Sequence, residues 1–538
     1  MANIFKKGID ALAWRQVAPA PNAHSVATAV CSDMRSGLSR NPFVYQLINN
    51  SVLNRFNVVT KGWAFVLSPV LAGTFGPGAA MAFAPSLSLV GTIAAGATAS
   101  KVTLSTALPT AVGLNMLSNH GGSGEYGFKL RIIDPTAGKT EERYITGNTV
   151  GTTPAIDVLS AFSFTPAAGA RYEILSGRVF MLGASTLAAN IWRSLDVASN
   201  TLSTGLSTTF LPATISTDSA ILVLDEQYVP YDCNPGEGMV RGDFTYDTGF
   251  ETRKALTATA TSASTLTGQA SLGDAVVAAN EFRNFQIRVV QDLINLTAVG
   301  QRRIIASHTA GPSPVYTLGT AWTGITPSAS AKYVIELPNL MLMRSSTTMS
   351  VYTYNYGDAT VNNGTNSIAA GAWNATYFGV AGAVVSVGCM WAPSFGIEPD
   401  AGRNARHSHC HFFRGASAAV DTLDIAGSIT GTWTTGVTID GATTLTTGTS
   451  GCYSPFDNEG RMFYMNIYTA SAVNQLFRFD VKNRVLSPFT PTDFLQSGTG
   501  SVGNRMAAYC AVDGTDIYGC VLLQSHLSTI TQEMIPLA

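Results

Sequence analysis

The segment GRVFML at residues 177–182 recurs as GRMFYM at residues 460–465. Downstream, NIWRSLDVASNTLS (190–203) recurs as NQLFRFDVKNRVLS (474–487). Each copy reads as an apolar strand, a short turn, a second strand that ends in Asp-Val, and a polar turn. Strands that alternate with a period of two across a short connection predict an antiparallel hairpin. The repeat therefore predicts a β-sheet unit that the chain uses more than once.

Weaker copies of the same pattern start at Phe43, Asn339, Cys410 and Asp516, which brings the total to about six units. The FRFDV strand, with Gly-Arg-Met-Phe before it, resembles the kelch-type propeller repeat, and the last three units start roughly 50 to 55 residues apart, close to the kelch period. Four-stranded sheets in a ring close a β-propeller, whereas a linear solenoid is expected to carry polar terminal repeats. The last unit is instead an apolar strand, which favours closure into a ring over a linear solenoid. The sequence therefore predicts an all-β fold, an about six-bladed kelch-like β-propeller.

A second repeat lies between the blade units. FKLRII at 128–133 is similar to FQIRVV at 285–290, and Tyr172-Glu-Ile is similar to Tyr333-Val-Ile. Each copy is rich in predicted strands and is about 50 residues long. We expect one small β-module, inserted before the second blade and again before the third.

These repeats divide the chain into six segments. The expected division is an N-terminal docking arm (1–37), a first blade unit (38–63), an insertion with the first β-module (64–176), a second blade unit (177–230), an insertion with the second β-module (231–337) and the remaining propeller blades (338–538). We expect the arm to dock onto a neighbouring molecule and the insertions to contact other subunits.

The chain is large, nearly neutral and poor in charge. Of its 538 residues, 12% are charged and 46% are hydrophobic, and the formal net charge is −2. A protein whose main ligand is a nucleic acid would show a basic excess, and a disordered chain would carry more net charge and fewer apolar residues. Few charges leave little repulsion between copies, which favours a subunit of an assembly.

The stretch from Gly62 to Ser100 has no charged residue and is the membrane candidate of this sequence. A membrane-spanning helix needs about 20 apolar residues with an unbroken hydrogen-bond ladder. Pro69, Pro77 and Pro85 interrupt that ladder. We therefore expect buried β or irregular structure in a protein interface, and no membrane insertion.

The motif His407-Ser-His-Cys-His411 is the cluster that most resembles a metal site. Alternate side chains of a strand share a face, so His407, His409 and His411 would project together while Cys410 points away. Imidazoles at this spacing can chelate zinc or nickel. The alternative is a blade strand that presents polar side chains to a central channel or a subunit contact. These histidines are the candidate metal ligands, and we expect no other cofactor.

The carboxylates favour structural roles. Asp196, Asp424, Asp480 and Asn57 occupy equivalent places in the blade units, and recurrence predicts that they cap the turn amides that follow. A glycosidase needs two carboxyl groups across one cleft, which would be expected once rather than in every blade.

Other familiar motifs are missing or incomplete. Gly138-Lys-Thr140 ends like a phosphate-binding loop, but Ile133 stands where that loop needs its first glycine. The sequence contains no nucleophile elbow, HExxH or GxGxxG motif, so we expect no catalytic residue and no enzymatic activity. The tryptophans that could stack on sugars are expected to lie in blade and module cores: Trp322, Trp373, Trp391 and Trp433.

The N-terminal pattern is similar to the opening of virion structural proteins of tailed bacteriophages. It runs through Ser32-Asp-Met-Arg35, Asn41-Pro-Phe-Val-Tyr45 and Leu53-Asn-Arg-Phe-Asn-Val58 to Trp63. The module with RIID, ERYI, GNT and YEIL resembles small β-inserts of such proteins. The resemblance implies a virion component, and propeller-bearing tail proteins of short-tailed phages form a ring below the portal that continues the DNA channel.

The expected function is therefore a structural one in the virion, most simply a tail nozzle, hub or collar protein that assembles into an oligomeric ring. The expected partners are copies of itself and other virion proteins, such as a portal, adaptor or capsid protein, with passive contact with DNA. A capsid decoration or head-fibre protein, a host-glycan-binding adhesin and a propeller glycan hydrolase are the alternatives. The hydrolase would need an unpaired pair of carboxylates in a pocket.

Overall fold

Strands make up nearly all secondary structure of the described chain, as its period-two alternation predicts. The computed structural model describes residues 14–22, 29–32, 43–48, 52–57, 61–67, 79–118, 128–183, 191–203, 205–211, 219–224, 255–269, 278–345, 349–381, 389–394, 409–438, 441, 444–445, 449–453, 462–468, 474–481, 483–488, 505–513, 516–524 and 531–534. Within these ranges the one helical turn is the 3₁₀ segment η2 (Leu296–Ala298), and no helix is long and apolar enough to cross a membrane.

Five sheets among the described residues have four antiparallel strands each. They consist of β2 (Ala29–Ser32), β3 (Phe43–Ile48), β4 (Val52–Asn57) and β5 (Gly62–Leu67); β14 (Ser219–Val223), β22 (Leu340–Ser345), β23 (Tyr352–Asn355) and β26 (Trp373–Asn374); β27 (Met390–Ser394), β28 (His409–Phe413), β29 (Ala419–Asp424) and β30 (Thr432–Thr438); β31 (Ser450–Tyr453), β32 (Met462–Tyr468), β33 (Asn474–Asp480) and β34 (Val485–Pro488); and β35 (Arg505–Asp513), β36 (Asp516–Gln524), β37 (Thr531–Met534) and β1 (Trp14–Val17).

Two long strands join a further small sheet to the first module. β6 (Ala80–Thr92) and β11 (Arg171–Leu182) pair along most of their length. The C-terminal half of β11 also pairs with β12 (Trp192–Asp196), which is followed by β13 (Thr201–Leu202). Its N-terminal half pairs instead with β8 (Lys129–Asp134) of the module. One strand therefore belongs to both the small sheet and the module.

The two modules have the same strand order, which confirms the repeat seen in the sequence. The first module consists of β7 (Lys101–Thr103), β8, β9 (Lys139–Asn148), β10 (Ala155–Val158) and the N-terminal half of β11. The second consists of β15 (Leu256–Thr257), β16 (Ala260–Thr261), β17 (Thr265–Thr267), β18 (Gln286–Gln291), β19 (Arg302–His308), β20 (Val315–Leu318) and β21 (Lys332–Glu336). The order β11-β8-β9-β10-β7 in the first corresponds to β21-β18-β19-β20-β17 in the second.

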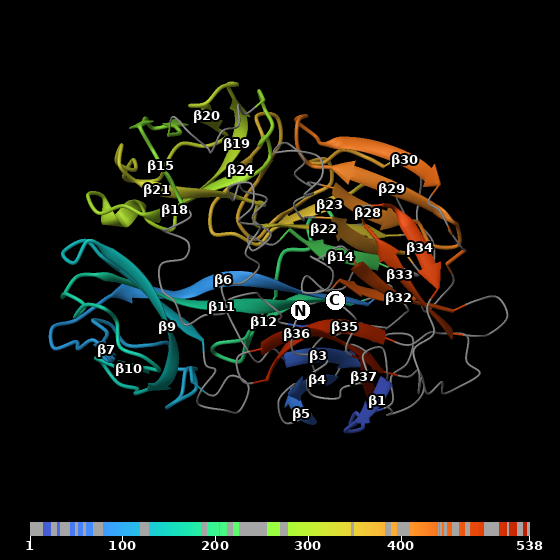
Figure 1. The fold of residues 1–538 in the computed structure, drawn as a ribbon, viewed down its shortest axis with the longest axis horizontal. Helices are drawn as coiled ribbons and strands as arrows, with labels where there is room; N and C mark the ends of the chain where they lie inside the picture. The colour runs from blue at the N-terminus through green and yellow to red at the C-terminus, as the bar shows by residue number, and fades with distance from the viewer. Residues whose placement is uncertain are drawn as a thin grey trace.

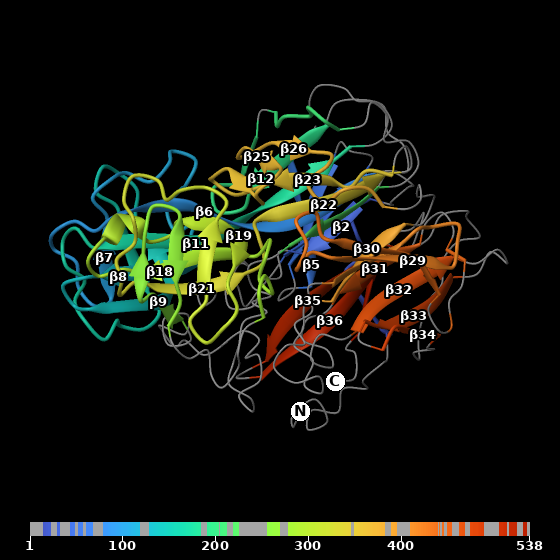
Figure 2. The same ribbon diagram turned by 90° about the horizontal axis from the view of Figure 1, so that it is seen from above.

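One edge strand of each small sheet contacts the edge strand of the next in a closed cycle, from β2 to β6, β14, β27, β31, β35 and back to β2. The N-terminal strand β1 pairs with β37, with Trp14 opposite Met534 and Val17 opposite Thr531. One sheet thus contains both ends of the described chain. The sheets form a propeller-like ring, and the two modules lie together at one side of it (Figures 1 and 2).

Strand pairing corrects two expected boundaries. The sequence predicts a docking arm over residues 1–37; of the residues described in this range, β1 and β2 lie in sheets of their own chain. It also predicts modules inserted before a blade, whereas each module lies between the first and second strands of one sheet, because β6 pairs with β11 and β14 pairs with β22. The sequence repeat covers only contiguous strands, so it misses a first strand that is far away in the chain. Residues 225–254 lie outside the described part.

Aromatic side chains fill the space between neighbouring sheets. Trp192 of β12 lies 5.2 Å from Tyr354 and 5.0 Å from Trp373, measured between ring centroids. Trp322, Trp373 and Trp391 are buried, as the sequence predicts, whereas Trp433 is only partly buried and packs against the same core. These contacts bury large apolar surfaces between sheets, where each ring adds to the stability of the core.

Candidate functional site

The described part of the histidine motif, His409-Cys410-His411, lies on β28, the second strand of its sheet. The rings of His409 and His411 are stacked, with centroids 6.5 Å apart and an interplanar angle of 8°, so they share a face as predicted. Cys410 is buried on the opposite side of the strand. His407 lies outside the described residues, so a three-histidine metal site stays a prediction. Among the residues that are described, no three His, Cys, Asp or Glu side chains are grouped to bind a metal ion.

The two described histidines have polar partners in their own sheet. His411 is 2% exposed, and its Nδ1 lies 3.0 Å from Oγ1 of Thr422 on β29. Its ring packs edge-on against Phe479 of the next sheet. His409 Nε2 lies 3.8 Å from Oδ2 of Asp424. His411 therefore supports the packing between two sheets, and His409 is the more accessible of the pair.

Side-chain oxygens at the end of the third strand cap the following turn in several sheets. Oδ1 of Asp196, Asp424 and Asp480 each accepts a hydrogen bond of 2.9–3.0 Å from a backbone amide two or three residues further on. This confirms the predicted capping role of the three aspartates. Asn355, at the end of β23, accepts the same bond at 3.0 Å. Asn57 ends β4, the third strand of its sheet.

The sequence prediction of capping residues includes Asn57 but misses Asn355, which occupies the equivalent place in its own blade unit. The signal that could have found it is its place in the blade unit, directly after the YTY of β23. Capping at equivalent positions gives these side chains a common structural role, and it engages oxygens that a hydrolytic site would need.

A buried ion network joins the β22 strand to the neighbouring sheet. Arg344 and Asp421 are both fully buried, and Arg344 Nη1 donates to Asp421 Oδ2 over 2.9 Å. Arg414 Nε donates to the other carboxylate oxygen over 2.9 Å. The guanidinium of Arg344 also lies over the rings of Phe412 and Trp433, 4.3 and 5.6 Å from their centroids. This network acts between sheets and has the character of a structural lock.

Burial and hydrogen bonding shift the pKa values of Asp421 and Arg344 in opposite directions. Burial alone would raise the pKa of Asp421, but the hydrogen bonds from Arg414 and Arg344 outweigh it and hold the pKa below its ordinary value. Burial lowers the pKa of Arg344, and the bond to Asp421 opposes that shift. Asp421 is thus an ionised carboxylate that holds two arginines.

Equivalent polar side chains stabilise both modules. Arg143 Nε donates to the carbonyl of Ala161 over 3.0 Å, and its guanidinium lies 5.0 Å from the ring of Phe162. Arg303 makes the matching hydrogen bond in the second module over 2.7 Å and lies 5.4 Å from the ring of Trp322. Because the arrangement recurs, we assign it to the module fold rather than to a ligand.

Glu141 makes another contact that recurs in both modules. Its Oε2 accepts the amide of Ser163 over 2.9 Å, and in the second module Oε1 of Gln301 accepts the amide of Thr323 over 2.9 Å. A neutral amide does the same work as the carboxylate, so the charge is not essential to the contact. Lys139 of the loop-like motif donates to Ser163 over 2.7 Å and begins β9 instead of a helix, as expected for a structural turn.

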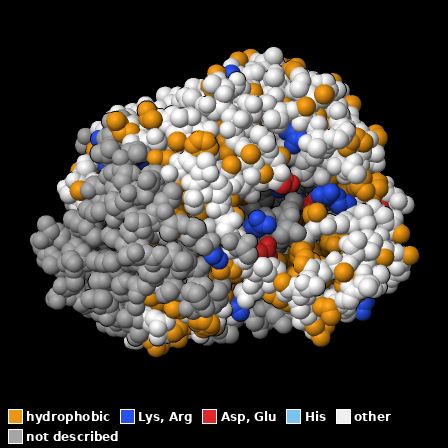
Figure 3. Space-filling model, turned by 180° about the vertical axis from the view of Figure 1, so that it is seen from behind, with side chains coloured by type: hydrophobic (Ala, Val, Ile, Leu, Met, Phe, Trp, Pro, Cys, Tyr) orange, Lys and Arg blue, Asp and Glu red, His pale blue; other side chains and the backbone are white. Residues whose placement is uncertain are grey.

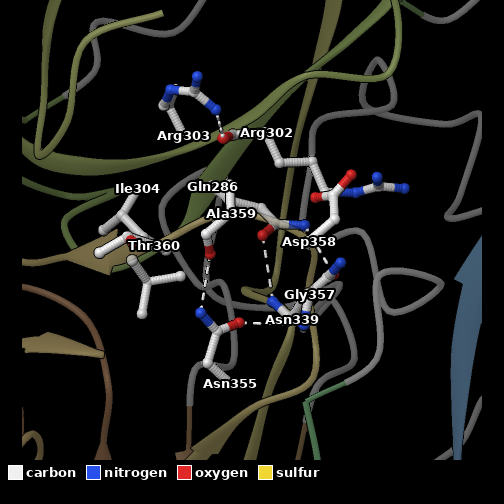
Figure 4. A pocket seen from close by; sticks show the side chains of 11 residues that line it. Gln286, Arg302, Arg303, Ile304, Asn339, Asn355, Gly357, Asp358, Ala359 and Thr360 are labelled. Atoms are coloured by element: carbon white, nitrogen blue, oxygen red, sulfur yellow. Dashed lines mark hydrogen bonds between the residues drawn. The ribbon is translucent and has the colours of Figure 1, made fainter. Parts of the chain in front are cut away.

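A small hollow lies where the second module meets the ring (Figure 4). Gln286, Arg302 and Arg303 line it from the module, and Asn339 and Asn355 line it from the ring. Gln286 Nε2 donates to Asn339 Oδ1 over 2.9 Å across this junction. The hollow is partly open to solvent, and the space inside it is about 10 Å³, close to what one water molecule needs.

Charged side chains are sparse on the face shown in Figure 3, and several gather around a hollow near its centre. Most of the remaining described surface of this face is polar or apolar, with a few isolated Lys or Arg side chains. The large exposed apolar side chains of the described chain include Phe65, Phe210 and Ile294, which are 62, 62 and 72% exposed. The buried tryptophans named above provide no platform for sugar stacking.

No protein family and no curated protein matches the sequence. Among solved structures, the chain is similar to a structural genomics protein of unknown function from Bacteroides thetaiotaomicron VPI-5482. That match has 8% sequence identity and a TM-score of 0.22, and it covers 84% of this chain and 98% of the other. Similarity at this level supports no conclusion about function.

Proposed function

We propose that this chain is a non-enzymatic structural protein of a tailed-bacteriophage virion, a tail component of the nozzle, hub or collar type that assembles into an oligomeric ring. The proposal rests on one observation: the described side chains that could have formed a catalytic or binding site instead make contacts that hold the fold together. The aspartates cap turns, the buried carboxylate holds arginines, and the polar side chains of the modules recur in both copies. The virion assignment rests on the N-terminal sequence pattern described above.

We further propose that the ring is a six-bladed propeller. The cycle of contacts from β2 through β6, β14, β27, β31 and β35 supports this count. Each of these six strands lies at the inner edge of a set of four strands, when β6, β11, β12 and β13 are counted as one blade. In the last blade, β1 provides the outermost strand, so pairing of the two chain ends closes the ring.

The innermost strands support a passive relation to DNA. β2, β6, β14, β27 and β31 contain no charged residue, and β35 has charges only at its two ends, Arg505 and Asp513. A surface that binds the phosphate backbone needs several Lys or Arg side chains. We therefore assign the propeller to the frame of the particle, and a channel for DNA would be formed by the ring of subunits.

The oligomeric state tests this function. The purified chain should form a closed ring of about six or twelve copies, because tail components share the rotational symmetry of the tail. Light scattering after size-exclusion chromatography measures the mass directly. A stable monomer that binds host glycan would contradict the proposal, and recovery on the capsid shell of the particle would replace it with the decoration role.

A further inference from the structure

The two modules touch each other through their turns. A methyl group placed on Gly300, in the turn before β19, would lie 3.0 Å from Nη2 of Arg171 and 3.4 Å from Oε1 of Glu173 in the first module. A methyl group on Gly138 would lie 3.9 Å from Leu293 of the second module. Ile133 of the first module also belongs to the apolar cluster that fills the second. The modules are therefore in direct contact rather than separate lobes.

A buried carboxylate lies at this contact. The side chain of Glu173 is 1% exposed, and its Oε1 lies 2.9 Å from Arg171 Nε, while its Oε2 lies 3.1 Å from Arg131 Nη1. Arg131 also pairs with Glu142 of β9 over 2.7 Å. Lys129 Nζ lies 3.6 Å from Oε2 of Glu142 as well. The first module thus presents a chain of alternating charges to its neighbour.

The second module has a matching buried ion pair next to this contact. Glu336 is fully buried and is held by Arg288 Nη2 over 3.0 Å. Arg302, on β19 two residues after Gly300, has its Nε 3.8 Å from Oε1 of Glu336. Gly300, two residues before Arg302, lies against Glu173 of the first module, and the charge of Arg302 is near enough to help lower the pKa of Glu173.

We propose that Arg302 is a clasp between Glu173 and Glu336 that fixes the two modules as a single rigid lobe beside the ring. The clasp opens when the charge of Glu173 or Arg302 is removed, because the partner charges are then left buried without compensation. This inference goes beyond the proposed function and does not depend on the virion assignment.

The charge of Glu173 is maintained at neutral pH. Burial on its own would raise the pKa of this carboxyl, but Arg131, then Arg171 and Arg302, outweigh it and lower the pKa below the ordinary value of 4.5. The groups that face it are Arg131, Glu142, Arg171 and Arg302. A lowered carboxyl pKa means that the stabilisation is complete above the ordinary value and is lost as pH falls through the lowered one. The clasp therefore stays closed near pH 7.

A double-mutant cycle of Glu173→Gln and Arg302→Gln tests the clasp. Hydrogen exchange of the turns at residues 134–139 and 298–301 reports opening of the contact. Each single variant should exchange about 100-fold faster there, and the double variant should be no faster than either single variant, because the interaction is already lost. The matched control is Arg178→Gln, which removes a half-exposed arginine 3.8 Å from Asp196 and should leave both turns unchanged.

Charge and packing are separated by Arg302→Lys, which keeps the charge and should retain most of the protection. Equal acceleration in the Lys and Gln variants would mean that packing holds the lobe and would overturn the proposal. Additive effects in the cycle, or acceleration spread evenly over both modules, would also overturn it. If Arg302→Gln does not fold, Glu173→Gln and the Lys variant still give the comparison.

Discussion

Asp421 shows how single residues hold this molecule together. Its carboxylate accepts hydrogen bonds from Arg344, Arg414 and the amide of Gly436, and it is fully buried. Arg344 and Asp421 are 77 residues apart, and nothing in their sequence surroundings marks them as partners. The sequence predicts the local aspartate caps from their recurrence, whereas a contact between two sheets leaves no such pattern.

We expect Asp421→Asn to lower the free energy of unfolding by about 3 kcal/mol, because two arginines lose their buried counter-ion. Chemical denaturation followed by tryptophan fluorescence measures the change. Asp480→Asn serves as the control, since an asparagine can still cap the turn, and it should change stability by less than about 0.5 kcal/mol. Similar effects of the two substitutions would argue against a buried lock.

The same residue should make stability depend on pH. The pKa of Asp421 is lowered from its ordinary value of 3.8, so its contribution is complete above that value and is lost as pH falls through the lowered pKa. The stability difference between wild type and Asp421→Asn should therefore be constant near neutral pH and shrink in strong acid. Denaturation at a series of pH values measures it, and a difference that grows towards acid would contradict the assignment.

Glu141 tests whether the charges of the modules have a chemical role. Gln301 makes the equivalent contact in the second module, so Glu141→Gln should fold normally, with a stability change below about 1 kcal/mol. Glu141→Ala, which leaves the amide of Ser163 without its acceptor, should cost more, about 1–3 kcal/mol. Thermal unfolding of the two variants provides the comparison, and an equal loss in both would reject the equivalence.

At the scale of elements, period-two alternation and repeats predict the strands and the duplicated module well. They predict the boundaries less well, because the first strand of a sheet lies far from the other three in the sequence. β6 precedes β11 by an entire module, and β14 precedes β22 in the same way. The pairing of β1 with β37 joins residues from opposite ends of the chain, and no local pattern records such a partnership.

Removal of residues 1–17 should therefore open the ring at one sheet. β37 would lose its partner along the register from Trp14 to Val17, and its amides should exchange at least about tenfold faster. Hydrogen exchange with peptide-level detection measures this at residues 531–534. Protection of β29 on the far side of the contact cycle should not change. A truncated chain with a fully protected β37 would show that β1 does not close the ring.

At the scale of the molecule, the low charge of the sequence acquires a more specific meaning. Several of the few charges are buried in ion pairs, including Arg131, Glu173, Arg288, Glu336 and Arg344. On the face shown in Figure 3, charged side chains are sparse, and several of them gather around the hollow. Such a surface offers little repulsion between copies, which agrees with the proposed role in an assembly.

Electron cryo-microscopy of the purified protein tests the central proposal most directly. We predict closed rings of about six or twelve subunits, each with a propeller of six blades whose last blade contains the N-terminal strand. The two modules of each subunit should appear as one lobe. Isolated monomers at micromolar concentration, or a propeller left open between its first and last sheets, would contradict this account.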